Sequence, residues 1–359
     1  MQAPAAGKVD MKRRQYLAAS LAVSARFAAP AGLFALAGCE APGAPPARLA
    51  GTTMGTTYHV SLAQPLSPRE ALSLRAGIEA VLARVDALMS TYRPDSELVR
   101  FNAAPAGARL VVSPDTAVVV DHALRTWLIS GGAFDATVGP LVDLWGFGPH
   151  DVQQLPTDEA VADASALVGS DDLAVDPATG TLVKARDGVQ LDLSGIAKGH
   201  AVDRVAEHLD GAGIDAYLVD IGGELRSRGR KADRSTWRVG IEKPLPGERR
   251  LQRVLALDGE SIATSGDYRN FFERGGRHYS HTIDPRSGRP VQHALAGVSV
   301  IAERAMQADA LATALMVLGP DAGMALAERL ALPALFLSRG AGGGVIERAT
   351  RDWAGRIVA

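Results

Sequence analysis

The segment DLSGIAKGHAVD, residues 192–203, combines glycine, carboxylate and hydroxyl residues where a buried core would hold apolar side chains. Its pattern predicts that a strand ends near Asp192 and that a helix begins after Gly195 and ends near Gly211. Backbone N–H groups are unpaired in the first turn of a helix, so such a junction suits an anionic ligand. Lys198 is placed there against the helix dipole, which favours an acid. The segment therefore indicates a phosphate-binding site, with a solvated surface lysine as the alternative.

Helical and strand patterns are mixed irregularly on both sides of this segment. Helices are predicted from Ser67 to Leu88, from Ser113 toward Gly131, from Ala305 to Leu318 and from Asp321 onward. Strands are predicted at 58–62, 217–221, 237–241, 254–257 and 298–301. Because these elements do not alternate regularly, the expected fold class is α+β rather than a doubly wound parallel sheet. Residues 51–359 show no break in composition and are expected to form one domain.

The first 38 residues have the layout of an export signal of the lipoprotein type. A basic start, Met11-Lys12-Arg13-Arg14, precedes the small and apolar stretch 27–38, and Leu36-Ala37-Gly38-Cys39 resembles a lipobox. We expect residues 1–38 to be removed, Cys39 to be lipidated and residues 39–50 to form a flexible tether. The expected location is the periplasmic face of the inner membrane, and the choice between Sec and twin-arginine export stays open.

The composition excludes several classes of protein. Of 359 residues, 47% are hydrophobic and 22% are charged, which is typical of a globular protein with a core. The net charge of −2 and the aromatic content of 5% do not favour a nucleic-acid partner. Cys39 is the only cysteine, so an internal disulfide framework and a cysteine-based zinc site are excluded.

Asp309 and Thr313 are a candidate pair of metal ligands. They stand four residues apart in a predicted helix and therefore share one face, among small and apolar neighbours. An acid and a hydroxyl are costly on such a face unless they are paired or bound to a metal. Hard oxygen ligands suit Mg²⁺, which is also held by substrate phosphates. The alternative is that Asp309 caps a helix and that Thr313 bonds back to the helix.

Two further segments carry candidate site residues. The stretch GAFDATVGP, residues 132–140, has glycines that let the backbone approach a ligand, and Phe134 suits the face of an aromatic ring. Its alternative is a plain helix-to-loop turn capped by Asp135. His281 and Asp284 bracket a turn, and a histidine suits a general base near neutral pH. A histidine that only donates or accepts a structural hydrogen bond is the alternative there.

Taken together, these segments resemble the ApbE family of FAD:protein FMN transferases. The matching runs occur in the family's order: Thr53-Met54-Gly55-Thr56, Ser90-Thr91-Tyr92, 134–141, 192–199, 219–223 and 281–285. The resemblance extends over nearly all of the chain that follows the tether. It implies an α+β fold with an internal duplication, in which mixed sheets pack with helices.

The resemblance also implies a substrate, a metal and a set of roles. Magnesium would be held by Asp309, Thr313 and the backbone carbonyl of Gly195, and His281 would be the best candidate base, with the Asp284 carboxylate beside it as a second proton acceptor. The FMN half of FAD would pass to a threonine or serine hydroxyl of exported subunits of redox complexes, with release of AMP. The alternatives are an FAD pyrophosphatase, a non-catalytic FAD-binding lipoprotein and a solute-binding receptor. The residues expected to contact FAD are Met54, Tyr92, Ala133, Phe134, Asp135, Asp192, Lys198 and Ile283.

Overall fold

The computed structural model describes residues 46–150, 152, 154–244, 250–268 and 271–358. The predicted signal peptide and the lipidation site Cys39 lie outside the described residues. Strand β1 (Arg48–Thr53) starts within the predicted tether, so the last three residues of the tether, 48–50, belong to the folded sheet. The boundary expected at Gly51 is therefore corrected to the start of β1.

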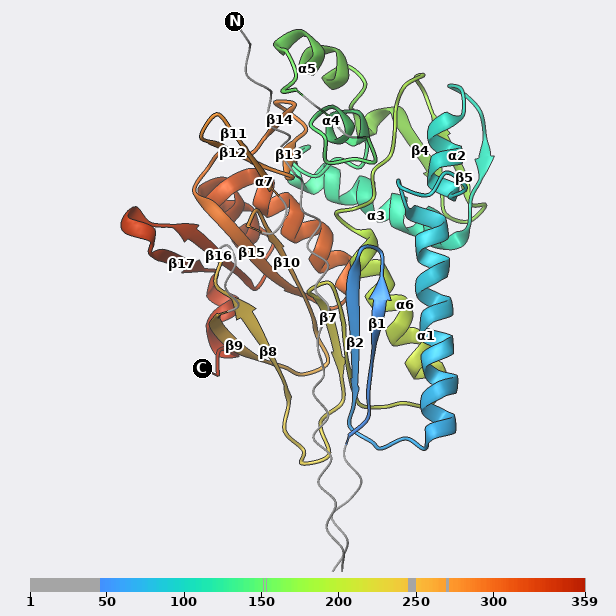
Figure 1. The fold of residues 1–359 in the computed structure, drawn as a ribbon, viewed down its shortest axis with the longest axis vertical. Coiled ribbons are helices and arrows are strands. Elements are labelled where there is room, and N and C mark those ends of the chain that lie inside the picture. The colour runs from blue at the N-terminus through green and yellow to red at the C-terminus, as the bar shows by residue number, and fades with distance from the viewer. Residues whose placement is uncertain (1–45, 151, 153, 245–249, 269–270, 359) are drawn as a thin grey trace, which may run out of the picture. The chain divides into compact units, whose positions relative to one another are not determined.

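An eight-stranded antiparallel sheet forms the centre of the domain (Figure 1). Its order is β1-β2-β6-β7-β10-β15-β16-β17, and every neighbouring pair is antiparallel. After β1, the bounds are β2 (Thr56–Leu62), β6 (Tyr217–Ile221), β7 (Glu224–Arg228), β10 (Ser261–Gly266), β15 (Leu295–Ala302), β16 (Ala334–Arg339) and β17 (Val345–Ala349). The strands predicted at 58–62, 217–221 and 298–301 are confirmed as parts of this sheet. Antiparallel pairing throughout excludes a doubly wound parallel sheet and confirms the α+β class.

Four smaller sheets complete the strands of the described residues. The pair β8 (Trp237–Glu242) and β9 (Leu251–Leu257) confirms the strands predicted at 237–241 and 254–257. The others are β3 (Leu110–Val111), β5 (Thr181–Lys184) and β4 (Leu173–Asp176); β11 (Phe271–Arg274) and β12 (Arg277–Ser280); and β13 (Ile283–Asp284) and β14 (Arg289–Pro290). Of these small sheets, strands β8 and β13 contribute residues to the wall of the site described below.

The helices predicted at Ser67 and Ser113 begin where the local sequence signals placed them. Ser67 and Glu70 form a capping box at the start of α1 (Pro68–Met89), and Ser113 caps α3 (Pro114–Ser130). The element α7 (Ala305–Arg329) consists of the two predicted helices, which are joined at a kink where Gly319 is non-helical (φ 81°) before Pro320. The other helices are α2 (Glu97–Ala103), α4 (Gly139–Leu144), α5 (Asp158–Ser165) and α6 (Ala197–Gly211), with short 3₁₀ turns η1 (Ser170–Asp172), η2 (Ala341–Gly343) and η3 (Arg351–Arg356).

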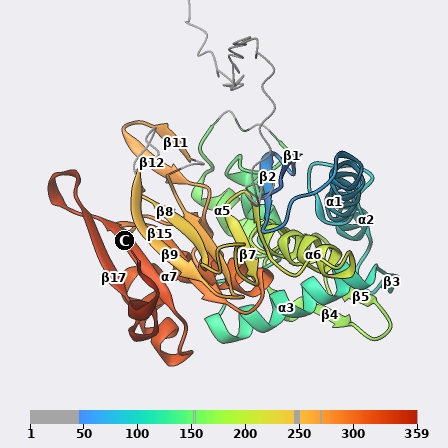
Figure 2. The ribbon, with the colours of Figure 1, turned by 90° about the horizontal axis from the view of Figure 1, so that it is seen from below.

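The two faces of the large sheet are covered differently. Helix α7 packs on β10 and β15, and α6 packs on β6 and β7, while α1, α3 and α6 lie together at one end of the sheet (Figure 2). By length and composition α7 is apolar enough to cross a membrane, but most of it is buried, as in the core helix of a globular domain. The β8–β9 pair and η3 contribute Val239, Leu255 and Trp353 to a separate core on the other face. The sheet thus holds α7 and β8 on opposite sides.

Asp115, in the first turn of α3, connects this helix to α1 and α6. Its carboxylate lies 3.5 Å from His200 Nε2 and 3.2 Å from the Nε atoms of both Arg84 and Arg204. The neighbouring His200, followed by Arg84 and Arg204, lowers the pKa of Asp115 from 3.8 to about 2 against the effect of burial. This carboxylate therefore stabilises the fold in its charged form.

We expect Asp115→Asn to lower the free energy of unfolding by about 2 kcal/mol at neutral pH. Because the folded pKa is below the unfolded one, this contribution is complete above pH 4 and is lost as the pH falls toward 2. Urea unfolding of the wild type and the variant between pH 7 and pH 2 measures the effect. A difference between the two proteins that stays constant over this range would contradict the prediction.

Candidate active site

A cavity of about 840 Å³ is lined by residues of the large sheet, of β8, of α7 and of the loops that contain Phe134 and Gly195. This size is typical of cofactor and substrate sites. Sequence-predicted residues that line it are Tyr92, Ala133, Phe134, Asp135, Asp192, Gly195, Lys198, His281, Ile283, Asp309 and Thr313. The fold therefore brings together residues that stand more than 200 positions apart in the chain.

Asp309 lies on α7 and is buried, with only 3% of its surface exposed. Its Oδ2 atom accepts a hydrogen bond of 2.9 Å from the backbone N–H of Gly199, in the first turn of α6. Asp309 thus caps α6 rather than its own helix, and it supplies the acid that the dipole of α6 favours. Burial raises the pKa of Asp309, Lys198 opposes the rise, and Glu224 adds to it.

Gly199 permits this contact because α6 and α7 approach each other closely here. A Cβ atom on Gly199 would collide with the backbone carbonyl of Ala305 and would lie 2.7 Å from the Cα atom of Met306. We therefore expect Gly199→Ala to lower the free energy of unfolding by about 1–3 kcal/mol, as overpacking does in other cores.

Gly211→Ala, at the other end of α6, is the matched control, because nothing lies within 4 Å of its Cβ position. The control is expected to be neutral or to stabilise by up to about 1 kcal/mol. Urea unfolding measures the free energy of unfolding of both variants. Equal values for the two would rule out the close contact between α6 and α7 at Gly199.

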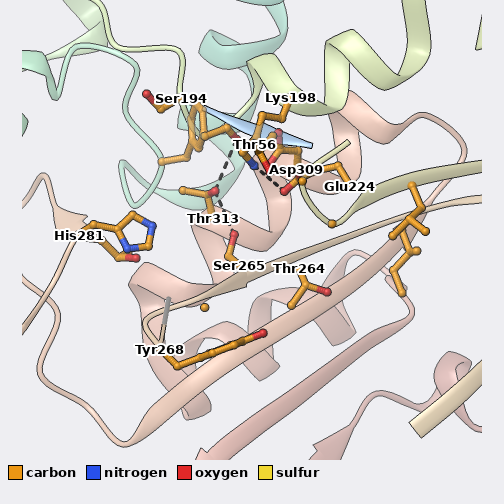
Figure 3. Close-up of a pocket in the computed structure, with 18 of the residues that line it drawn as sticks. Thr56, Ser194, Lys198, Glu224, Thr264, Ser265, Tyr268, His281, Asp309 and Thr313 are labelled. Atoms are coloured by element: carbon orange, nitrogen blue, oxygen red, sulfur yellow. Dashed lines mark hydrogen bonds and ion pairs between the residues drawn. The ribbon is translucent and has the colours of Figure 1, made fainter. Parts of the chain in front are cut away.

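Lys198 and Glu224 form an ion pair beside Asp309 (Figure 3). Lys198 Nζ lies 2.5 Å from Glu224 Oε1, and 34% of the lysine side chain is exposed. Lys198 is therefore not the solvated surface lysine of the alternative interpretation. Glu224 is buried, and within the described residues its Oε2 atom has no hydrogen-bond partner. Two buried carboxylates share one lysine in this part of the cavity, which favours the entry of a cation.

Thr313 and Gly195 place two further oxygens in the same part of the cavity. Thr313 Oγ1 lies 3.5 Å from the carbonyl oxygen of Gly195 and 3.2 Å from Ser265 Oγ. A Cβ atom on Gly195 would lie 3.2 Å from Thr313 Oγ1 and 3.3 Å from the ring of Phe134, so the missing side chain keeps this space open. The carbonyl and the hydroxyl therefore face the cavity within reach of one small ion.

These donors match the preference of Mg²⁺ for oxygen ligands. The described part of the chain has no cluster of three or more His, Cys, Asp or Glu side chains that could hold a metal. An ion held by Asp309, Thr313 and the Gly195 carbonyl would accordingly keep coordination positions for water and for substrate phosphates. The residues present fit magnesium on these grounds.

His281 also lines the cavity (Figure 3). Its ring meets Phe147 edge to face, with 6.4 Å between the ring centroids. The Tyr92 hydroxyl donates a hydrogen bond of 3.1 Å to the Phe147 carbonyl, and Phe272 stacks on the Phe147 ring. Phe147 therefore connects Tyr92 to His281, a role that the sequence analysis missed.

Two predicted ligand-contacting carboxylates are engaged in building their own loops. Asp135 Oδ1 accepts hydrogen bonds from the Thr137 hydroxyl at 2.6 Å and from Ser170 Oγ at 2.7 Å. Asp192 Oδ1 accepts one of 2.7 Å from the backbone N–H of Ser194. These bonds hold the loops around the cavity in place, so both acids shape its wall.

The structure corrects one sequence prediction and places two predicted site residues outside the cavity. In place of a strand before Asp192 there is an isolated bridge at Gln190. Met54 does not line the cavity, because it forms the β1–β2 hairpin turn (φ 44°) and packs on the core. Asp284 does not line it either, since its carboxylate accepts two hydrogen bonds of 2.9 Å from the Arg286 guanidinium. Asp284 is thus paired within its own turn, and its role as a proton acceptor stays a prediction.

The fold and the site define an α+β protein with a ligand cavity whose oxygen donors suit a divalent cation. The model of the ApbE family matches residues 54–336 of this sequence. The chain belongs to the ApbE family, which confirms the resemblance found in the sequence.

Relatives named FAD:protein FMN transferase match most of the chain. The FAD:protein FMN transferase of Vibrio cholerae is 45% identical over 310 residues, covering 86% of this chain and 91% of the relative. That of Haemophilus influenzae is 43% identical, covering 81% and 86%. The structure of the flavin transferase ApbE from Vibrio cholerae aligns with a TM-score of 0.79 at 41% identity, over 87% of this chain and all of that one. The apo flavinyl transferase ApbE of Pseudomonas stutzeri aligns with the same TM-score at 42% identity, over 88% and 98%. The chain is therefore an enzyme of a flavin transferase family.

Proposed function

We propose that this enzyme transfers FMN from FAD to a threonine or serine hydroxyl of an exported acceptor protein and releases AMP. The observation that carries the proposal is the buried Asp309, which shares one cavity with Thr313, the Gly195 carbonyl and the Lys198–Glu224 pair. The names of the relatives, FAD:protein FMN transferase, support FAD as the substrate and a protein as the acceptor.

Magnesium is part of this proposal. Asp309, Thr313 and the Gly195 carbonyl would hold the ion, which would supply positive charge to the pyrophosphate as its phosphorus–oxygen bond breaks. Lys198 would add a second positive charge beside the ion, held in place by its pairing with Glu224. The alternative of a solute-binding receptor has no use for such a set of ligands.

The chemical step would be an in-line displacement at the FMN phosphorus. The acceptor hydroxyl oxygen forms the new bond to phosphorus, and the bond to the AMP oxygen breaks, with its electron pair leaving on AMP. His281 would take the hydroxyl proton as a general base. Tyr92 and Phe134, whose aromatic rings line the cavity, would contact the flavin nucleotide.

One assay separates transfer from its alternatives. The full chain is incubated with FAD, Mg²⁺ and an acceptor domain from an exported redox complex, and AMP release and flavin fluorescence on a denaturing gel are followed. Fluorescence on the acceptor together with AMP supports the transferase. AMP without labelling would replace it by the pyrophosphatase, in which water takes the place of the hydroxyl. If neither product forms, the interpretation as a non-catalytic FAD-binding lipoprotein is the one that remains.

We further propose that Cys39 anchors the enzyme by a lipid to the periplasmic face of the inner membrane. The lipobox-like run Leu36-Ala37-Gly38-Cys39 supports this location, and exported acceptor subunits would be met there. Cell fractionation tests it, because Cys39→Ala should move the protein from the membrane to the soluble periplasmic fraction. Unchanged membrane association of this variant would reject the lipid anchor.

A further inference from the structure

Strand β8 has an open edge that the proposed chemistry does not use. One edge of β8 pairs with β9, and no strand of the described residues pairs with the other. The far edge of β9 is covered, because Leu255 bridges to Ile357 and the Val358 N–H donates to the Val254 carbonyl at 2.9 Å. Open strand edges invite pairing with another chain, and proteins usually block them.

This open edge adjoins the active-site cavity. Five consecutive residues of β8, 238–242, line the cavity. Successive side chains of a strand point to opposite faces, and here Val239 and Ile241 are buried in the core below, whereas Arg238 and Gly240 are exposed. All five residues line the cavity although their side chains alternate between the two faces, so the cavity follows the backbone of β8. The backbone of β8, whose second edge has no partner strand among the described residues, therefore borders the cavity that holds the proposed metal ligands.

We propose that β8 is the docking strand for the acceptor protein, whose extended segment adds to the open edge and carries its hydroxyl into the cavity. This inference rests on the proposed transfer to a protein. Asp309 is buried, so a hydroxyl on a flat, folded surface would not reach the site, whereas an extended segment would. Main-chain hydrogen bonds supply affinity in such strand addition, and alternate side chains supply specificity. The exposed Arg238 favours an acidic residue in the docked segment.

A backbone methylation scan tests the docking mode. The probe is a synthetic peptide of about nine residues, centred on the hydroxyl residue labelled in the acceptor domain and N-methylated at one position at a time. In an added strand the N–H groups point alternately to the partner and away. We expect labelling to fall about tenfold at every second position, as for a lost hydrogen bond, and to change little in between.

Other outcomes of the scan overturn the inference. Equal sensitivity at consecutive positions would exclude strand addition. So would failure of the unmodified peptide at millimolar concentration while the whole acceptor domain is labelled, because strand addition does not need a folded acceptor. If the domain itself is never labelled, the proposed function fails, and the docking strand fails with it.

Thiol cross-linking tests whether the acceptor segment docks beside β8. Both variants are made in a Cys39→Ala chain, so that each holds a single thiol. Arg238→Cys puts this thiol on β8. The control Ile346→Cys puts it on β17, an edge strand of the large sheet, where Ile346 is exposed but does not line the cavity. With saturating FAD and diamide as the oxidant, a cysteine-bearing acceptor peptide should form a disulfide with the first variant at least about tenfold faster than with the second. Equal rates would contradict docking on β8, and loss of the cross-link on addition of FAD would assign this edge to FAD instead.

Discussion

Replacing Asp309 with alanine is expected to abolish AMP release from FAD, with a fall in rate of about a thousandfold or more, since several kcal/mol of charge stabilisation would be lost. Asp309 supplies the carboxylate of the proposed magnesium site, and Thr313 and the Gly195 carbonyl carry no charge to replace it. Chromatography of AMP, with Mg²⁺ varied over a wide range, measures the effect.

The matched control is Asp321→Ala, an exposed carboxylate of the same helix element, which should leave the rate unchanged. Asp309→Asn keeps a side-chain oxygen that can accept from the Gly199 N–H but loses the charge, so it separates loss of the metal from loss of the α6 cap. Urea unfolding of each variant shows whether it is folded. Full activity of folded Asp309→Ala, or of the wild type in excess EDTA, would reject the metal assignment.

Replacing His281 with alanine is expected to lower the rate of flavin transfer by about 10²–10⁴-fold while FAD still binds, as is typical when a general base is removed. The imidazole lines the cavity and rests against Phe147, so its loss removes a proton acceptor without removing the proposed phosphate-binding residues. Initial rates give the fall, and quenching of flavin fluorescence gives the affinity for FAD.

His150→Ala is the control histidine, because its side chain is 77% exposed and lies outside the cavity. It should transfer flavin at the wild-type rate. An unchanged rate in His281→Ala would remove this residue as the base. A large loss of FAD affinity with the rate at saturation preserved would make it a binding residue.

Features with strong local signals could be predicted from the sequence. The capping box at Ser67 and Glu70 depends on two residues three positions apart, and the start of α3 at Pro114 follows its serine cap in the same way. The spacing of Asp309 and Thr313 put both on one helix face, and the structure shows both on the cavity. These signals act within one or two turns of a helix, so a single sequence contains them.

Features that depend on distant partners could not be predicted. The partner of Lys198 is Glu224, 26 residues away, and the partner of Asp309 is the Gly199 N–H, 110 residues away. Strand β1 has little apolar alternation and is held by pairing with β2. Asp284 is a different case, because the arginine that binds its carboxylate stands only two residues later and was visible in the sequence.

The most direct test of the central claim is the ratio of AMP released to flavin covalently attached to the acceptor domain, measured with and without EDTA. The proposed transfer predicts one AMP for each flavin attached, with both products lost when EDTA removes the metal. Attachment of flavin that continues at the full rate in EDTA, or AMP release with no flavin on the acceptor, would contradict a metal-dependent FMN transfer.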